Sequence, residues 1–260
     1  MAVVFGGVGV ALVTLFGADG EVDAVATGKH AADLASRGVA GVLVCGTTAE
    51  AATLTEAERV MLIESVRAAL PDNVPVIAGT GAPSARQAVT LTKMAVAAGA
   101  DAMLTWCPAG ADGPPSPAAL VGFYTEIADA AGDCPVLAYH NPFITCADLP
   151  VVDLGALPVV GLKDSSGRPD RLLDELTSYA GDTYVGSAGF LALAGPLGAA
   201  GGLLALANLA PEACVAAFGG DVTAQRDLAG QHLALTRGGI PQLKRMLAGA
   251  AGLSPVCRIW

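Results

Sequence analysis

Short apolar runs alternate along the chain with longer segments in which apolar residues recur at helical spacing. Runs of roughly four to eight apolar residues bounded by Gly, Pro or Asp are typical of buried strands. Eight such runs are predicted as strands, at residues 9–16, 39–44, 74–79, 100–105, 134–139, 159–163, 183–186 and 201–206.

The segments between these runs carry the start and stop signals of helices. Thr55-Glu-Ala-Glu58 is a capping box, and Ser116 followed by Pro117 is a standard helix N-terminus. Helices are predicted at residues 22–36, 55–70, 84–98, 116–131, 148–154, 169–179 and 190–197, with helical material over 211–249. Regular strand–helix alternation without a linker predicts a closed (β/α)8 barrel, a TIM barrel, over residues 1–210. A short C-terminal helical extension, 211–260, follows it.

The main rival fold is a doubly wound open sheet. A doubly wound sheet that binds a nucleotide typically has a glycine-rich phosphate-binding turn after its first strand. The glycine clusters at Gly6-Gly7 and Gly201-Gly202 lack the Gly-x-Gly-x-x-Gly spacing, so the barrel is favoured.

Composition narrows the class of protein. The chain is 53% hydrophobic and 15% charged, with a formal net charge of −10, which argues against a nucleic-acid partner. No apolar stretch is long and unbroken enough to predict a membrane span, and no signal peptide is recognised. Six widely spread cysteines without a Cys-x-x-Cys pair are predicted to be reduced. A cytoplasmic location is therefore expected.

Lys163 is the candidate for chemistry, because it stands at the end of an apolar strand, 159–163. Burial disfavours the ammonium, lowers the pKa and yields a nucleophile that can form a Schiff base with a ketone. The alternative is a strand-end lysine whose ammonium reaches solvent.

Two other polar groups stand at predicted strand ends, and a barrel brings such ends to one mouth. Gly46-Thr47-Thr48 can offer backbone N–H groups and hydroxyls to an anion such as the carboxylate of a 2-oxo acid. Tyr139 could relay protons beside the lysine. The alternatives are an ordinary turn with a threonine N-cap, and a core tyrosine bonded to the backbone.

The remaining titratable residues give weaker signals. His140 is expected to start a turn, and the three histidines of the chain show no metal-ligand spacing. No metal and no cofactor is therefore predicted. The other lysines, Lys29, Lys93 and Lys244, fall in helical segments and are predicted to be solvated.

Several motifs in order resemble the dihydrodipicolinate synthase / N-acetylneuraminate lyase family. They are Gly46-Thr-Thr-Ala-Glu50, Tyr139-His-Asn-Pro142 and Gly161-Leu-Lys-Asp-Ser-Ser-Gly167. The resemblance implies a (β/α)8 barrel, usually a homotetramer, that forms an imine with pyruvate or a related 2-oxo acid. It also implies a role for each site residue: Schiff-base formation for Lys163, acid/base catalysis for Tyr139, carboxylate binding for Thr48, a relay hydroxyl for Thr47, and pocket lining for Gly186 and Leu203.

The chain departs from the family pattern at four places. Ala49 replaces a glycine, and the loop must shift if that site needs a positive φ. Ala109-Gly110 stand where the family commonly has two tyrosines. Ile144 stands where dihydrodipicolinate synthases carry an arginine for the second substrate. The usual final helix is missing before Trp260, so the C-terminal extension is expected to be truncated.

Three functions are compatible with these residues. The favoured one is a class I aldolase or lyase that joins a 2-oxo acid to an aldehyde or cleaves the product, for example a 2-keto-3-deoxy sugar acid. The second is dihydrodipicolinate synthase itself, against which Ile144 counts. The third is a degenerate barrel that binds a 2-oxo acid without catalysis. The expected partners are small molecules and copies of the chain, in a dimer or tetramer.

Overall fold

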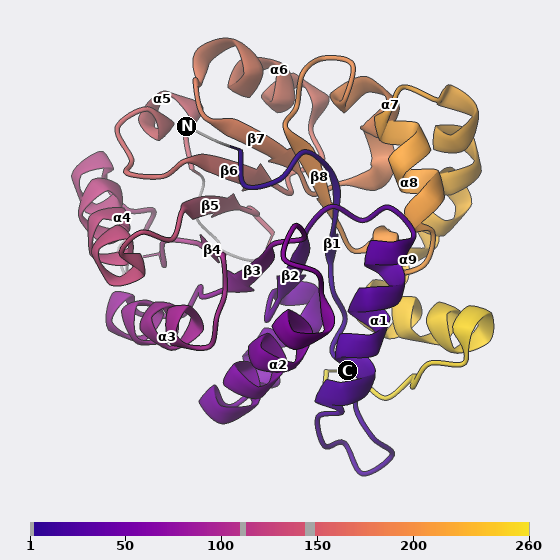
Figure 1. Ribbon diagram of the computed structural model, residues 1–260. Helices are drawn as coiled ribbons and strands as arrows, with labels where there is room; N and C mark the ends of the chain where they lie inside the picture. The colour runs from indigo at the N-terminus through magenta and orange to yellow at the C-terminus, as the bar shows by residue number, and fades with distance from the viewer. Residues whose placement is uncertain (1–2, 110–112, 144–148, 260) are drawn as a thin grey trace.

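The computed structural model describes residues 3–109, 113–143 and 149–259. Within these ranges eight parallel strands close into a barrel in chain order (Figure 1). The strands are β1 (Gly7–Ala11), β2 (Val42–Val44), β3 (Val76–Gly79), β4 (Ala102–Thr105), β5 (Val136–His140), β6 (Gly161–Asp164), β7 (Asp182–Val185) and β8 (Gly201–Leu204). The predicted (β/α)8 barrel is confirmed.

Helices surround the barrel and shield the outward faces of the strands (Figure 1). They are α1 (Ala24–Ser36), α2 (Glu56–Ala69), α3 (Ala85–Ala97), α4 (Pro117–Ala131), α5 (Val151–Leu154), α6 (Pro169–Ser178), α7 (Leu191–Ala194), α8 (Pro211–Phe218) and α9 (Val222–Ala251). Short 3-10 helices follow three of the strands: η1 (Thr47–Ala49), η2 (Ala51–Thr53), η3 (Ala188–Phe190) and η4 (Leu206–Asn208). A kink at Gly239, with φ 60° and ψ −156°, divides α9, and glycine adopts this conformation at low cost.

The apolar residues form two layers, one inside the barrel and one between the strands and the helices. The inner layer contains Leu43, Ile77, Leu104, Leu137, Tyr184 and Leu203. Tyr184 is fully buried, and its hydroxyl donates a hydrogen bond to the carbonyl of Phe5 at 3.0 Å. Phe5 packs against the Tyr184 ring, so the N-terminal segment closes the end of the barrel opposite the strand C-termini.

The first strand is shorter than predicted, because it leaves the sheet after Ala11 instead of running to Phe16. Beyond this point the side chain of Asn208, instead of a neighbouring strand, hydrogen-bonds to the backbone. Its amide donates to the carbonyl of Ala11 at 2.7 Å, and its oxygen accepts from the backbone N–H of Val13 at 3.1 Å. The residues that follow stay buried, which explains why the apolar run looked like a longer strand.

One of the three helical lysines contradicts the prediction that all three are solvated. Lys29 and Lys93 are exposed, as expected. Lys244 is 0% exposed and forms an ion pair with Glu50, at 2.5 Å between Nζ and Oε1. Its position beyond the kink in α9 brings it against the barrel, where the segment after the helix covers it.

The predicted capping box at the start of α2 is confirmed. The Thr55 hydroxyl accepts from the backbone N–H of Glu58 at 3.2 Å, and the Glu58 carboxylate accepts from that of Thr55 at 2.8 Å. Replacing Thr55 by Ala is expected to lower the free energy of unfolding by about 1 kcal/mol, measured by urea denaturation. The control is Thr125→Ala, an exposed threonine within α4, which is expected to have little effect. Equal effects for the two variants would contradict the capping role.

Candidate active site

The register between β5 and β6 determines which side chains meet at the barrel mouth. Tyr139 pairs with Lys163, and His140 pairs with Asp164. Successive residues of a strand point to opposite faces, so the two pairs lie on opposite sides of the barrel wall. Tyr139 belongs to the inner layer, whereas Asp164 lies 3.5 Å from the guanidinium of Arg171 on α6.

The amine of Lys163 is held away from water at the end of β6. The residue is 6% exposed, and burial lowers the pKa of the amine, while the proximity of Tyr139 partly opposes that shift. Nζ lies 4.9 Å from the centroid of the Tyr139 ring. Among the described residues no carboxylate forms an ion pair with Lys163. These surroundings favour the neutral, nucleophilic form.

Tyr139 stands beside this amine with its hydroxyl already hydrogen-bonded. The Asn141 amide donates to the phenolic oxygen at 2.9 Å. Burial by itself raises the pKa of the Tyr139 phenol, but the Lys163 charge and hydrogen bonds from Asn141, Ser165 and Thr47 together bring it below the ordinary value. The phenol therefore releases a proton more easily than a free tyrosine does.

The loop after β2 carries the two candidate threonines in η1. The hydroxyl of Thr14 donates to the carbonyl of Ala49 at 2.9 Å and fixes the loop against the barrel. The positive φ values of this region belong to Cys45 and Glu50, at 54° and 58°. Ala49 is not in the left-handed region, so its replacement of the family glycine does not force the loop to shift.

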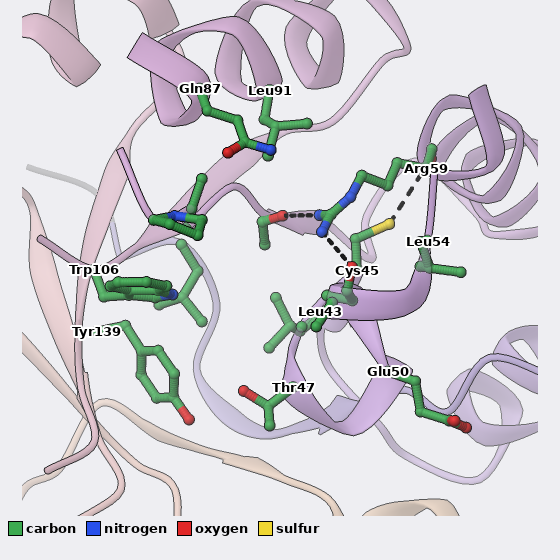
Figure 2. Close-up of a pocket in the computed structure, with 18 of the residues that line it drawn as sticks. Leu43, Cys45, Thr47, Glu50, Leu54, Arg59, Gln87, Leu91, Trp106 and Tyr139 are labelled. Carbon is green, nitrogen blue, oxygen red and sulfur yellow. Dashed lines mark hydrogen bonds between the residues drawn. The ribbon is translucent and has the colours of Figure 1, made fainter. Parts of the chain in front are cut away.

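A cavity of about 440 Å³ opens between these groups. Gly46, Thr47, Tyr139 and Lys163 line one part of it. Figure 2 shows the Tyr139 hydroxyl directed towards Thr47 across this part. The cavity continues past Trp106 to a second part between α2 and α3, lined by Arg59, Gln87, Leu91 and Leu54.

The other predicted site residues lie near the cavity but not in its wall. Thr48 is buried, at 8% exposure. Leu203 is 0% exposed and fills the barrel interior. Gly186 leaves space for a neighbour: a Cβ there would lie 2.0 Å from the hydroxyl of Ser165, one of the groups that hydrogen-bonds to Tyr139. The structure thus places Lys163, Tyr139, Thr47 and Gly46 around one cavity, with Thr48, Gly186 and Leu203 behind them.

Two residues that contact Tyr139 were missed by sequence reasoning, Asn141 and Ser165. Each is two residues beyond a candidate, Asn141 after Tyr139 and Ser165 after Lys163. That spacing was a usable signal, because alternate residues of a strand and its extension share a face. Ile144 and Gly110, two of the family departures, lie outside the described residues.

A buried set of charges lies on the outer side of β5 and β6. His140 ends β5 instead of starting a turn, and its Nδ1 lies 2.6 Å from the Asp164 carboxylate. Burial acts to raise the pKa of Asp164, but bonds from His140 and Ser166 lower it overall. On α6, Arg171 pairs with Glu175 at 2.7 Å, and burial raises the pKa of Glu175 to about 8. These side chains link β5, β6 and α6 on the outer side of the barrel wall.

Two general properties of the chain concern metals and membranes. Within residues 3–109, 113–143 and 149–259, no cluster of three or more His, Cys, Asp or Glu side chains is placed to hold a metal ion. Over the same part of the chain, none of the helices combines the length and apolar character needed to span a bilayer.

Comparison with known proteins gives the class. The chain matches the Dihydrodipicolinate synthetase family over residues 4–232. It is 37% identical over 221 residues to "Probable 4-hydroxy-2-oxoglutarate aldolase, mitochondrial" of Emericella nidulans, covering 80% of this chain and 71% of that protein. It is 34% identical over 209 residues to "4-hydroxy-tetrahydrodipicolinate synthase" of Methanosarcina mazei, covering 78% and 70%. The solved structure of dihydrodipicolinate synthase from Aquifex aeolicus superposes with a TM-score of 0.86 at 28% identity, covering 98% of this chain and 91% of that one.

The barrel and these relatives define an enzyme of the aldolase and lyase class. The chain belongs to the dihydrodipicolinate synthetase family.

The perturbed phenol can be observed directly, because the chain has four tyrosines. Burial raises the pKa of Tyr179 and Tyr184 to about 12, and it raises the pKa of Tyr124 further still. The first phenolate to form on raising the pH is therefore expected to be that of Tyr139, below pH 10. Ultraviolet titration of the folded protein measures this transition.

Tyr139→Phe is expected to remove the first transition, while Tyr179→Phe leaves it in place. Asn141→Ala is expected to move it to higher pH, because a hydrogen bond to the phenolate is lost. A first transition that survives in Tyr139→Phe would contradict the assignment.

Proposed function

We propose that this enzyme is a class I aldolase or lyase in which neutral Lys163 forms an imine with pyruvate or a related 2-oxo acid. The observation that carries the proposal is the position of one buried amine. Lys163 lines the same cavity as Tyr139 and Thr47, and burial lowers its pKa. An amine in this state can attack a ketone, whereas a solvated ammonium cannot.

The first half of the reaction converts the ketone to an enamine. The lone pair of Nζ adds to the carbonyl carbon, the nitrogen gives up a proton and the carbonyl oxygen takes one up, which gives a carbinolamine. The oxygen leaves as water after a second proton transfer, and an iminium remains. Loss of a proton from the neighbouring carbon gives the enamine. Tyr139 lies close enough to Lys163 to carry these protons, and its lowered pKa suits that role.

In the second half the enamine carbon attacks an aldehyde, and the aldehyde oxygen takes up a proton. Water then hydrolyses the iminium, which releases the product and restores the Lys163 amine. Cleavage is the reverse of this sequence. No cofactor is needed, because the iminium itself accepts the electron pair.

The threonine loop is proposed to bind the carboxylate of the 2-oxo acid. Gly46 and Thr48 would contribute backbone N–H groups or a hydroxyl, and Thr47 a hydroxyl that relays protons to Tyr139. Hydrogen bonding between Thr47 and Tyr139 supports the relay. Leu203 and Gly186 are proposed to limit the inner end of the pocket. Leu203 fills the barrel interior, and Gly186, which has no side chain, leaves room for the Ser165 hydroxyl.

The aldehyde partner is proposed to give a hydroxylated 2-oxo acid, such as a 2-keto-3-deoxy sugar acid. The relative from Emericella nidulans is named for an aldolase of this reaction type, with 4-hydroxy-2-oxoglutarate as its substrate. Synthesis of 4-hydroxy-tetrahydrodipicolinate is the second candidate, favoured by the relative from Methanosarcina mazei. Isoleucine at position 144 counts against it, because an aliphatic side chain cannot bind a carboxylate.

We also propose that the protein is cytoplasmic and works as a homo-oligomer, either a dimer or a tetramer. Unpaired cysteines support a reducing compartment: the five in the described residues form no disulfide. Phe143 and Val152 are large apolar side chains with exposures of 81% and 86%, which supports contact with another subunit.

Borohydride trapping tests the imine. After incubation with pyruvate and reduction, a stable adduct is expected on the Lys163 peptide, identified by mass spectrometry. Lys163→Arg is expected to abolish trapping, since a guanidinium stays protonated and forms no imine. Lys93→Arg, an exposed position on α3, is the matched control and should trap normally. An adduct absent from the Lys163 peptide for several 2-oxo acids would overturn the proposal.

A panel of aldehydes separates the two candidate reactions. With pyruvate as donor, kcat/KM for glyoxylate and sugar-derived aldehydes is expected to exceed that for aspartate semialdehyde. The expected ratio is at least roughly tenfold, the factor that corresponds to about 1.4 kcal/mol of lost carboxylate binding. Preference for aspartate semialdehyde would instead favour the synthase.

A further inference from the structure

The carboxylate of Glu50 joins three segments that are far apart in the sequence. Glu50 directly follows η1, which carries Thr47 and Thr48, and it is 2% exposed. Its backbone is left-handed, with φ 58°, a conformation that costs a non-glycine residue free energy. Figure 2 shows the side chain directed away from Tyr139 and Thr47. Glu50 is one of the residues that line the cavity, but its carboxylate points away from the reacting groups (Figure 2).

Groups from the C-terminal part of the chain neutralise and hydrogen-bond this carboxylate. The Lys244 ammonium lies 2.5 Å from Oε1. Oε2 accepts from the backbone N–H groups of Arg258 at 2.7 Å and Ile259 at 2.9 Å. Lys244 also donates to the carbonyl of Val256 at 2.7 Å. A buried carboxylate is costly unless it is paired and hydrogen-bonded, and here both conditions are met.

Arg258 attaches the same C-terminal segment to both sides of the threonine loop. Its guanidinium donates to the carbonyl of Gly20 at 2.8 Å and to that of Thr53, beyond the loop, at 3.2 Å. It also pairs with Glu58 of the α2 capping box at 2.6 Å. The contact with Arg258 is the main reason that the pKa of Glu58 is lowered to about 2. The segment Ser254–Ile259 is thus fixed at four points around the loop.

Small displacements of this loop matter to the site. Two residues separate Thr47 from Glu50, and the carbonyl of Ala49 between them is held by Thr14. Contacts from opposite sides therefore define where η1 lies. The C-terminal segment also reaches the site itself, because Ile259 lines the cavity together with Thr47 and Lys163. A misplacement of about 1 Å at a binding group can reduce activity by orders of magnitude.

We propose that Glu50 is a positioning residue, and that Lys244 and the segment Ser254–Ile259 act through it to hold the threonine loop in the conformation that binds a 2-oxo acid carboxylate. The proposal rests on the function proposed above for the threonines. In this arrangement the Glu50 carboxylate is taken up by Lys244 and the backbone of the C-terminal segment. Loss of the link weakens binding of the 2-oxo acid and leaves the reactivity of Lys163 intact, since the amine is held by β6.

Three variants test the link, Arg258→Ala, Lys244→Met and Glu50→Gln. Arg258 is partly exposed, so Arg258→Ala is expected to fold even if the two buried substitutions do not. Arg245→Ala is the matched control, because Arg245 is exposed on the same helix and hydrogen-bonds to Gln242. Circular dichroism confirms folding at the assay temperature before any other comparison.

The first readout is trapping of the Lys163 peptide by borohydride across a range of pyruvate concentrations. Arg258→Ala is expected to raise the half-saturating concentration roughly tenfold, the scale of a lost charge-assisted interaction, with the same trapped fraction at saturation. Arg258→Lys should recover part of the loss. A lower melting temperature with an unchanged half-saturating concentration would show a merely structural role and overturn the proposal.

The second readout does not depend on the reaction. Hydrogen–deuterium exchange of the peptide that spans Gly46–Thr53 is expected to accelerate in all three variants without substrate, and not in Arg245→Ala. Unchanged exchange in that peptide would overturn the proposal whatever the activity. A wild-type protein that forms no adduct with 2-oxo acids, yet shows the expected exchange, would overturn the function proposed for the threonines and leave the link established.

Discussion

Removal of the Lys163 amine from water is the constraint on which the site depends. The barrel interior that surrounds it is apolar, with Leu43, Leu104 and Leu137 in the same layer. A charged ammonium in such surroundings loses hydration that the neighbouring Tyr139 replaces only in part. Closure of the sheet by eight strands provides this environment, because an open sheet edge would admit water. The packing that closes the barrel therefore also keeps water away from the Lys163 amine.

The chain contains a second buried lysine with the opposite arrangement. Burial lowers the pKa of Lys244 as it does that of Lys163, but the Glu50 carboxylate opposes the shift. Lys244 also donates to a backbone carbonyl, and its ammonium lies over the ring of Phe16. These contacts are those of a structural cation. The two lysines therefore differ in their partners: a carboxylate opposes the effect of burial at Lys244, whereas no carboxylate among the described residues forms an ion pair with Lys163.

The acidic residue next to Lys163 in the sequence lies on the outer side of the barrel wall. Asp164 adjoins Lys163 in sequence, yet it points outwards to His140 and Ser166. An inward carboxylate would stabilise the ammonium and raise the pKa of the lysine. Asp164 thus supports the strands without pairing with the Lys163 amine, whereas the charged residues that line the cavity are Glu50, Glu56 and Arg59 besides Lys163.

The architecture could be predicted from the sequence because its signals are local. Apolar runs, the capping box at Thr55 and the Ser116-Pro117 pair each act within a few residues. Candidate residues at the barrel mouth followed from the rule that strand ends converge. Two of the errors came from contacts distant in sequence. Asn208 ends β1 from 195 positions away, and the pairing of Lys244 with Glu50 depends on how the part of α9 beyond its kink packs against the barrel. No pattern along the chain reports such contacts.

The paired register of β5 and β6 has a consequence for how this family can diversify. Tyr139 lies opposite Lys163 and His140 opposite Asp164, so inner and outer faces alternate in step on both strands. Insertion or loss of a single residue within β6 would turn its side chains over, bringing Asp164 into the cavity and Lys163 against α6. The same change within β5 would bring His140 inwards in place of Tyr139. Length changes are thus expected in the connecting loops, where they can alter what the cavity accepts while Tyr139 and Lys163 stay in register.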